Sequence, residues 1–212
     1  MTKSSSTIPL LIEKYKAFKH EHFKVNQTFK PLVEHGQQPK VLVIACSDSR
    51  VDPALLLGCE LGELFVVRNV ANLVPPYKQD PRHHGTSAAL EFAVMGLVVT
   101  DIIVLGHSHC GGIRALMGAA SSKGSDFITT WMSIAEPAKA HVLAHYGNCS
   151  AEEQAHRCEK GSLAISLNNL MSFPWIKKRV IDQQLSLHGW FFNLETGEIE
   201  AYNEEKKDFL PL

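Results

Sequence analysis

The chain contains the apolar run Val41-Leu42-Val43-Ile44-Ala45, followed directly by Cys46-Ser47-Asp48-Ser49-Arg50. A run rich in β-branched residues and without polar alternation is typical of a strand buried on both faces, as in a parallel sheet. Thiol and charged side chains begin where this predicted strand ends. Because functional groups gather at the carboxyl ends of parallel strands, the second half of the segment is a candidate functional site.

Two further runs of the same kind follow, at 64–68 and 102–106. The latter continues into His107-Ser108-His109-Cys110-Gly111-Gly112, so a second polar cluster also follows a buried strand. Small and apolar residues at helical spacing predict a helix over 85–99 between these two strands. Alternation of buried strands with helices predicts an α/β fold with a mainly parallel sheet flanked by helices.

The remaining pattern predicts an N-terminal helix over 8–29, broken near Val25, and a loop over 72–84. The apolar stripe of the N-terminal helix must pack against another apolar surface, and a partner subunit is one candidate for it. Helix is predicted over 113–120 and for most of 126–173, with a break at 147–148. Strands are predicted over 185–187, 190–194 and 199–202, with a hairpin turn at 195–198. The polar residues 203–208 are interpreted as a solvated tail.

The sequence shows no internal repeat or low-complexity linker, which favours a single domain over 1–212. Within it, we expect an N-terminal helical arm at 1–36 and an α/β core at 37–212.

Composition excludes several classes of function. The 212 residues carry 21 Lys and Arg against 22 Asp and Glu, so the balance gives no electrostatic footprint for nucleic acid or an anionic membrane. The apolar runs are too short to span a bilayer. Five widely spaced cysteines do not resemble a disulfide framework, and residues 1–6 show no leader pattern. We therefore expect a cytoplasmic location.

Cys46, His107 and Cys110 together make a Cys2His ligand set at neighbouring strand ends. Three protein ligands with a fourth position open are typical of a catalytic zinc, and two soft thiolates favour Zn²⁺ over Mg²⁺ or Ca²⁺. Either half of this pattern alone is more often structural. The four-ligand knuckle spacing of structural zinc sites is absent, however, so the combination predicts a functional metal centre.

Asp48 would add negative charge beside two thiolates unless it is neutralised, and Arg50 is its obvious partner. A bidentate Asp48–Arg50 pair would orient the carboxylate to accept a hydrogen bond from a zinc-bound water. Released from Arg50, Asp48 would be free to act as a fourth zinc ligand in a closed state. Gly111-Gly112 suits a tight turn from strand to helix near the metal.

In these motifs the sequence resembles the β-class carbonic anhydrases, from about Gln37 to Trp190. The motifs that carry the resemblance are 46–50, Gly62 to Asn72 and 106–112. The resemblance implies that Cys46, His107 and Cys110 hold Zn²⁺, beside catalytic Asp48 and Arg50. It implies a lyase, carbonate dehydratase, in which zinc-bound hydroxide attacks CO2 to give bicarbonate and a proton. It also implies a homodimer or higher even homo-oligomer, with the N-terminal arm on a partner subunit.

Residues 75–77 and 85–92 resemble the plant-type branch of this family. The resemblance implies a substrate pocket that involves Gln37, Phe65, Val70, Phe92 and Gly111. Gln37 would donate a hydrogen bond to CO2 or bicarbonate. Phe92 stands where plant members typically carry Tyr, so we expect it to act as an apolar wall only. His83, His84 and His109 are candidates for proton exit, although each is also interpretable as an ordinary histidine.

Two alternatives share the same motifs. One is a carbon disulfide or carbonyl sulfide hydrolase on the same scaffold, which the zinc motifs do not exclude. The other is a non-catalytic, zinc-stabilised protein. An intact Asp48–Arg50 pair argues against the second alternative, because a purely structural zinc has no need of a switchable carboxylate.

Overall fold

The computed structural model describes residues 7–80, 82–118 and 127–212. Residues 1–6, on which the expectation about a leader rests, lie outside the described residues. Contacts within the chain define two compact units, Met1–Gln38 and Pro39–Leu212. No helix in the described ranges is long and apolar enough to cross a membrane.

The N-terminal unit is helical, as its apolar stripe predicts. It consists of α1 (Thr7–Lys19), a π-helical turn (His20–Val25) and α2 (Phe29–His35). The predicted break near Val25 is confirmed, and Gln27 within it adopts a positive φ of 51°. None of the described residues of α1 is buried, so the apolar stripe is exposed within its own unit.

Six strands form one mixed sheet in the order β2-β1-β3-β4-β5-β6. The strands are β1 (Val41–Cys46), β2 (Leu64–Asn69), β3 (Asp101–His107), β4 (Ser186–Phe192), β5 (Ile199–Asn203) and β6 (Asp208–Pro211). The first four pair in parallel and the last two add antiparallel, so the predicted mainly parallel sheet is confirmed.

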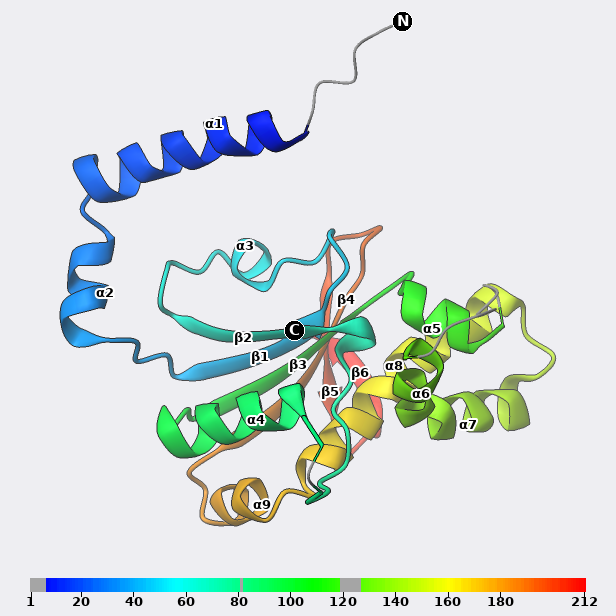
Figure 1. Ribbon diagram of the computed structural model, residues 1–212. Helices are drawn as coiled ribbons and strands as arrows, with labels where there is room; N and C mark the ends of the chain where they lie inside the picture. Colours follow the sequence, from blue (N-terminus) through cyan, green and yellow to red (C-terminus); the bar gives the residue numbers. More distant parts are fainter. Residues whose placement is uncertain (1–6, 81, 119–126) are drawn as a thin grey trace, which may run out of the picture. The chain divides into compact units, whose positions relative to one another are not determined.

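Helices flank this sheet (Figure 1). They are α3 (Pro53–Leu57), α4 (Gly85–Glu91), α5 (Gly111–Leu116), α6 (Ile128–Met132), α7 (Glu136–Tyr146), α8 (Ala151–Leu170) and α9 (Pro174–Ile181). Figure 1 shows α4, α8 and α9 on one side of the sheet and α3 on the other. The predicted break at 147–148 separates α7 from α8, and Ser150 caps α8 by accepting the Glu153 N–H at 3.1 Å.

The main core lies between the sheet and the α4, α8 and α9 layer. It contains Leu42 and Ile44 of β1, Ile102 and Val104 of β3, and Leu163 of α8, all fully buried. The opposite face of the same strands buries Val43, Ala45, Ile103 and Leu105. Burial on both faces explains why these two runs show no polar alternation.

The C-terminal part differs from expectation in two ways. The strands predicted at 185–187 and 190–194 are one strand, β4, which continues through Gly189. Glycine suits this position, because a Cβ there would lie 2.9 Å from Leu167 and 3.2 Å from Tyr202. Residues 203–208, predicted as a solvated tail, are exposed from 204 to 208 but do not form a tail. These residues turn a hairpin from β5 into β6, and Phe209 packs on the main core.

Helix ends also differ from the predicted ranges. The helix predicted over 85–99 continues from α4 into a π-helical turn that ends at Gly96, and Val98 has a φ of 55°. The helix predicted over 113–120 is α5, which ends at Leu116. Residues 119, 120 and 126 of the predicted helices lie outside the described residues.

Candidate metal centre

The ends of β1 and β3 lie side by side in the sheet. The parallel register pairs Ala45 with Leu105, so Cys46 and His107 end neighbouring strands at the same edge. Cys110 follows after a short turn, directly before the first residue of α5. Sheet geometry therefore brings together the two clusters that the sequence placed 61 residues apart, counted from Cys46 to His107.

Cys46, His107 and Cys110 form a compact, buried group. One ligand atom from each residue lies within 4.8 Å of the others. In the part of the chain that the structure describes, this is the one group of three or more His, Cys, Asp or Glu residues that meets this distance. The three predicted metal ligands thus converge.

The orientation of His107 suits metal binding. Its Nδ1 lies 2.8 Å from the backbone oxygen of Ser108, which fixes Nδ1 as the N–H donor. The other nitrogen, Nε2, then carries the lone pair. It is buried and has no hydrogen-bond partner among the described residues. A buried, unpartnered acceptor of this kind calls for an explanation, and a metal ion supplies one.

The two thiols interact strongly. A hydrogen bond from Cys110 lowers the pKa of Cys46 to about 4, and burial opposes this shift. The same contact, together with burial, raises the pKa of Cys110. Backbone N–H groups of Asp48 and Ala71 face Cys46, and those of Gly112 and Ile113 face Cys110. These N–H donors lower the pKa of both sulfurs and so favour the thiolate form that binds metal, although burial and Cys46 outweigh them at Cys110.

The donor set therefore fits a Zn²⁺ ion with three protein ligands. Two thiols and one imidazole with a free, buried nitrogen match the Cys2His sets of zinc enzymes. Gly112 keeps the turn close-packed, because a Cβ there would lie 2.8 Å from Val70 and 3.2 Å from Ala71. A Cβ at Gly111 would meet no atom within 4 Å in the described ranges, so Gly111 faces open space.

Asp48 and Arg50 form a bidentate pair beside this group. Arg50 Nε donates to Asp48 Oδ1 at 2.9 Å and Nη2 donates to Oδ2 at 2.7 Å. The backbone N–H of Arg50 also donates to Oδ1 at 3.0 Å. The Arg50 guanidinium holds the pKa of Asp48 well below its usual range, so the carboxyl is ionised.

Arg68 stabilises the loop that carries this pair, a role that the sequence pattern does not predict. From β2, Arg68 donates to the backbone oxygens of Cys46 at 3.0 Å and Asp48 at 2.6 Å. It also pairs with Asp52 at 3.2 Å, at the start of α3. No local spacing signals this role, because Arg68 reaches the loop only through the pairing of β1 with β2.

The predicted substrate-pocket residues divide into two groups. Val70 and Gly111 lie at the metal loop, since Gly111 directly follows Cys110 and Val70 packs against Gly112. Trp131 Nε1 donates to the Val70 backbone oxygen at 2.7 Å. Val70 also lines a cavity of about 740 Å³ with His83, His84 and Trp131.

Phe65 and Phe92 instead contact each other at 5.8 Å between ring centroids. Phe65 pairs with Leu42 in the neighbouring strand. Leu42 precedes Cys46 by four residues, so about 13 Å of strand separates the level of Phe65 from that of Cys46. Gln37 belongs to the N-terminal unit. One copy of the chain therefore does not gather Phe65 and Phe92 around its own metal ligands.

The candidates for proton exit have different surroundings. His109 Nε2 lies 3.0 Å from Glu195 Oε1, and its backbone has a φ of 57°. His84 Nε2 lies 2.7 Å from Asp80 Oδ1. His83 and His84 line the cavity beside Val70, so they are the candidates with access to that space.

An α/β sheet with a buried Cys2His group and a paired Asp–Arg at its edge is the arrangement expected of a metal-dependent enzyme. Comparison with known proteins identifies the family. The sequence profile of the carbonic anhydrase family matches residues 41–199. Beta carbonic anhydrase 3 of Arabidopsis thaliana is 38% identical over 193 residues, which cover 90% of this chain and 74% of that protein. The chain belongs to the β-class carbonic anhydrases, and the predicted family is confirmed.

Other relatives support this assignment. A carbonic anhydrase of Synechocystis is 36% identical over 201 residues, or 94% of this chain and 73% of that protein. The structure of the β-carbonic anhydrase CcaA matches with a TM-score of 0.90 at 35% identity, covering 98% of this chain and 93% of that one. One of two tetrameric β-carbonic anhydrases from Sordaria macrospora matches with a TM-score of 0.81 at 28% identity, covering 92% and 96%.

Proposed function

We propose that this protein catalyses the reversible hydration of CO2 to bicarbonate and a proton at a Zn²⁺ ion held by Cys46, His107 and Cys110. One observation carries the proposal. Three buried ligand atoms converge within 4.8 Å, and His107 Nε2 among them has no other partner in the described ranges. When bound, Zn²⁺ supplies the acidity that makes water a nucleophile near neutral pH.

The remaining roles belong to side chains of the chain itself. Asp48, ionised and held by Arg50, presents a carboxylate that can accept a hydrogen bond from the attacking water. Arg50 prevents Asp48 from turning to the metal as a fourth ligand, and loss of their pairing would give the closed state. Val70 supplies apolar surface for CO2, and the open space at Gly111 leaves room for bicarbonate.

We further propose that Gln37, Phe65 and Phe92 serve the site of a second copy of the chain. Phe65 and Phe92 lie far along the sheet from the metal ligands of their own chain, and Phe92 is half exposed. The exposed apolar stripe of α1 supports an even homo-oligomer, and the related Sordaria macrospora enzyme is described as tetrameric. Five free thiols support the predicted cytoplasmic location.

A substrate comparison tests this function against its rival on the same scaffold. The zinc-loaded protein is assayed with CO2, carbonyl sulfide and carbon disulfide under identical conditions. We expect turnover of CO2 to exceed that of both sulfur compounds by orders of magnitude. Faster turnover of either sulfur compound would replace the proposal with the hydrolase alternative.

A further inference from the structure

The peptide group between His109 and Cys110 is held at both ends. Its oxygen, on His109, accepts a hydrogen bond from Arg50 Nη2 at 3.2 Å. Its N–H, on Cys110, donates to Glu159 Oε1 at 2.8 Å. His109 adopts a φ of 57°, a left-handed conformation that residues other than glycine rarely adopt. The contacts at both ends therefore stabilise an unusual turn directly before a predicted metal ligand.

Glu159 is an unusual residue for its position. It lies within α8 and is only 4% exposed, although carboxylates are almost never fully buried unless they are paired. One carboxylate oxygen accepts the Cys110 N–H, and the other lies 3.7 Å from His156 Nδ1. A hydrogen bond from an amide to a carboxylate is stronger than one between neutral groups. The buried carboxyl group is thus directed at the metal loop.

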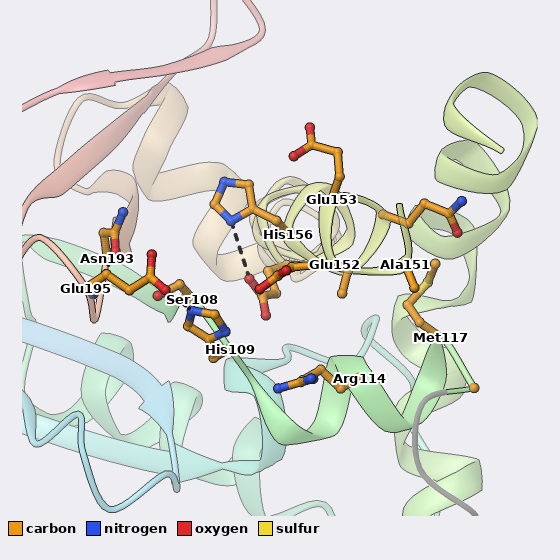
Figure 2. A pocket seen from close by; sticks show the side chains of 14 residues that line it. Ser108, His109, Arg114, Met117, Ala151, Glu152, Glu153, His156, Asn193 and Glu195 are labelled. Carbon is orange, nitrogen blue, oxygen red and sulfur yellow. Dashed lines mark hydrogen bonds and ion pairs between the residues drawn. The ribbon is translucent and has the colours of Figure 1, made fainter. Parts of the chain in front are cut away.

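Glu159 borders a cavity as well as the metal loop. A cavity of about 610 Å³ adjoins the metal loop, and Figure 2 shows His109 and Glu195 on one side of it and His156 and Glu152 on the other. Glu159 lines this cavity as well. It therefore lies between the cavity and the Cys110 amide, outside the proposed metal ligand set.

We infer that Glu159 is a positioning residue for the metal centre, which acts by fixing the His109–Cys110 peptide. This inference rests on the proposed zinc site. With the peptide fixed, the Cys110 sulfur faces Cys46 and His107, and the His109 oxygen faces Arg50. Glu159 thereby links α8 to a metal ligand and to the Asp48–Arg50 pair through one peptide group. Its loss should disturb zinc binding itself, in addition to any effect on folding.

The test uses the full-length protein stripped of metal with a chelator and titrated with Zn²⁺. Glu159→Ala removes the acceptor, Glu159→Asp shortens its reach, and Glu159→Gln keeps an oxygen at the same distance. Glu153→Ala is the matched control, because Glu153 lines the same cavity from the same helix but pairs with Arg157. Zinc affinity is measured by competition with a chromophoric chelator, and the absorption spectrum of the Co²⁺-loaded protein reports ligand geometry.

We expect Glu159→Ala to weaken zinc binding about 10- to 100-fold and to shift the absorption spectrum of the Co²⁺-loaded protein. Glu159→Gln should restore most of the affinity, and Glu153→Ala should match the wild-type protein. If Glu159→Ala fails to fold, Glu159→Asp decides the question with the same two readouts. Wild-type affinity and an unchanged Co²⁺ spectrum in the folded variant would overturn the inference, even if its melting temperature fell.

The zinc measurements also separate this inference from the proposed function. Affinity and spectrum do not depend on turnover of CO2. A wild-type protein that binds zinc but does not hydrate CO2 would contradict the proposed function. The ratio of zinc affinities between Glu159→Ala and wild type would still decide the role of Glu159.

Discussion

Arg50 Nη2 lies 3.2 Å from the backbone oxygen of His109, a residue 59 positions later in the chain. The same nitrogen donates to Asp48 at 2.7 Å. Arg50 thus joins the loop after β1 to the loop after β3, the two segments that carry the predicted metal ligands. The pairing of Asp48 and the geometry of the metal loop are therefore coupled through a single guanidinium.

Replacing Arg50 tests this coupling. Arg50→Lys keeps the charge but loses the bidentate geometry, so we expect CO2 hydration to fall on the order of 10- to 100-fold. Arg82→Lys is a matched control, because Arg82 makes a similar pair with Asp80 at the same spacing. Stopped-flow rates of the two variants check the prediction, and equal rates would contradict it.

Zinc content tests the ligand set. His107→Ala and Cys110→Ala should each abolish stoichiometric zinc binding, because two ligands alone hold Zn²⁺ weakly. Cys59→Ser should retain one zinc per chain, since Cys59 is a partly exposed thiol outside the group. Metal analysis after dialysis gives the stoichiometry. Full zinc content in either ligand variant would show that another residue binds the ion.

The two adjacent glycines should respond differently to alanine. Gly112→Ala places a Cβ 2.8 Å from Val70, so we expect a loss of about 1–3 kcal/mol in the free energy of unfolding. Gly111→Ala meets open space and should leave stability nearly unchanged. Urea unfolding of both variants measures the difference. A Gly112→Ala variant as stable as Gly111→Ala would contradict the packing of this turn.

Asp101 gives a pH dependence outside the metal centre. Burial raises its pKa, but hydrogen bonds from His188 and Thr100 outweigh burial and lower the pKa below its ordinary value. A lowered pKa in the folded state stabilises the protein at pH values above the pKa of the unfolded state, about 3.9. This stabilisation is lost as the pH falls through the pKa of the folded state.

Asp101→Asn should therefore cost on the order of 0.5 kcal/mol or less at pH 7, because both partners are partly exposed. The difference from wild type should disappear under acidic conditions, below the folded pKa. Urea unfolding at neutral and acidic pH measures it. A cost that grows as the pH falls would contradict the assigned direction of the shift.

The N-terminal helix should contribute to assembly. Leu10, Leu11 and Ile12 are about half exposed in α1, so Leu11→Glu should weaken a contact with a second copy. Lys14→Glu in the same helix changes charge without removing apolar surface. Sedimentation of both variants against wild type gives the oligomeric state. An unchanged even oligomer in Leu11→Glu would exclude this stripe from the interface.

Much of the fold follows from local pattern. The β-branched runs at 41–45 and 102–106 predict buried strands because both of their faces are covered. The ends of these runs predict the metal ligands because parallel strands finish at one edge. The hairpin at 203–208 escaped prediction, since its polar residues resemble a tail and the packing of Phe209 that anchors it is not local.

The supporting contacts of the site required the tertiary structure. Arg68 and Glu159 act on backbone groups that are 22 and 49 positions away in the chain, and no spacing rule connects them. The free Nε2 of His107 depends on a hydrogen bond from Nδ1 to a backbone oxygen, which the sequence does not specify. Residue type predicted the ligands, whereas their orientation comes from packing.

Cys46, His107 and Cys110, with Asp48 beside them, make the proposed centre for CO2 hydration. Stopped-flow measurement of CO2 hydration by the zinc-loaded protein, from about pH 6.5 to 9, tests it most directly. We predict that the activity rises with pH, because two thiolates make the bound water less acidic than three imidazoles would. We also predict that Asp48→Ala abolishes the activity. No activity at any pH with one zinc per chain would contradict the claim.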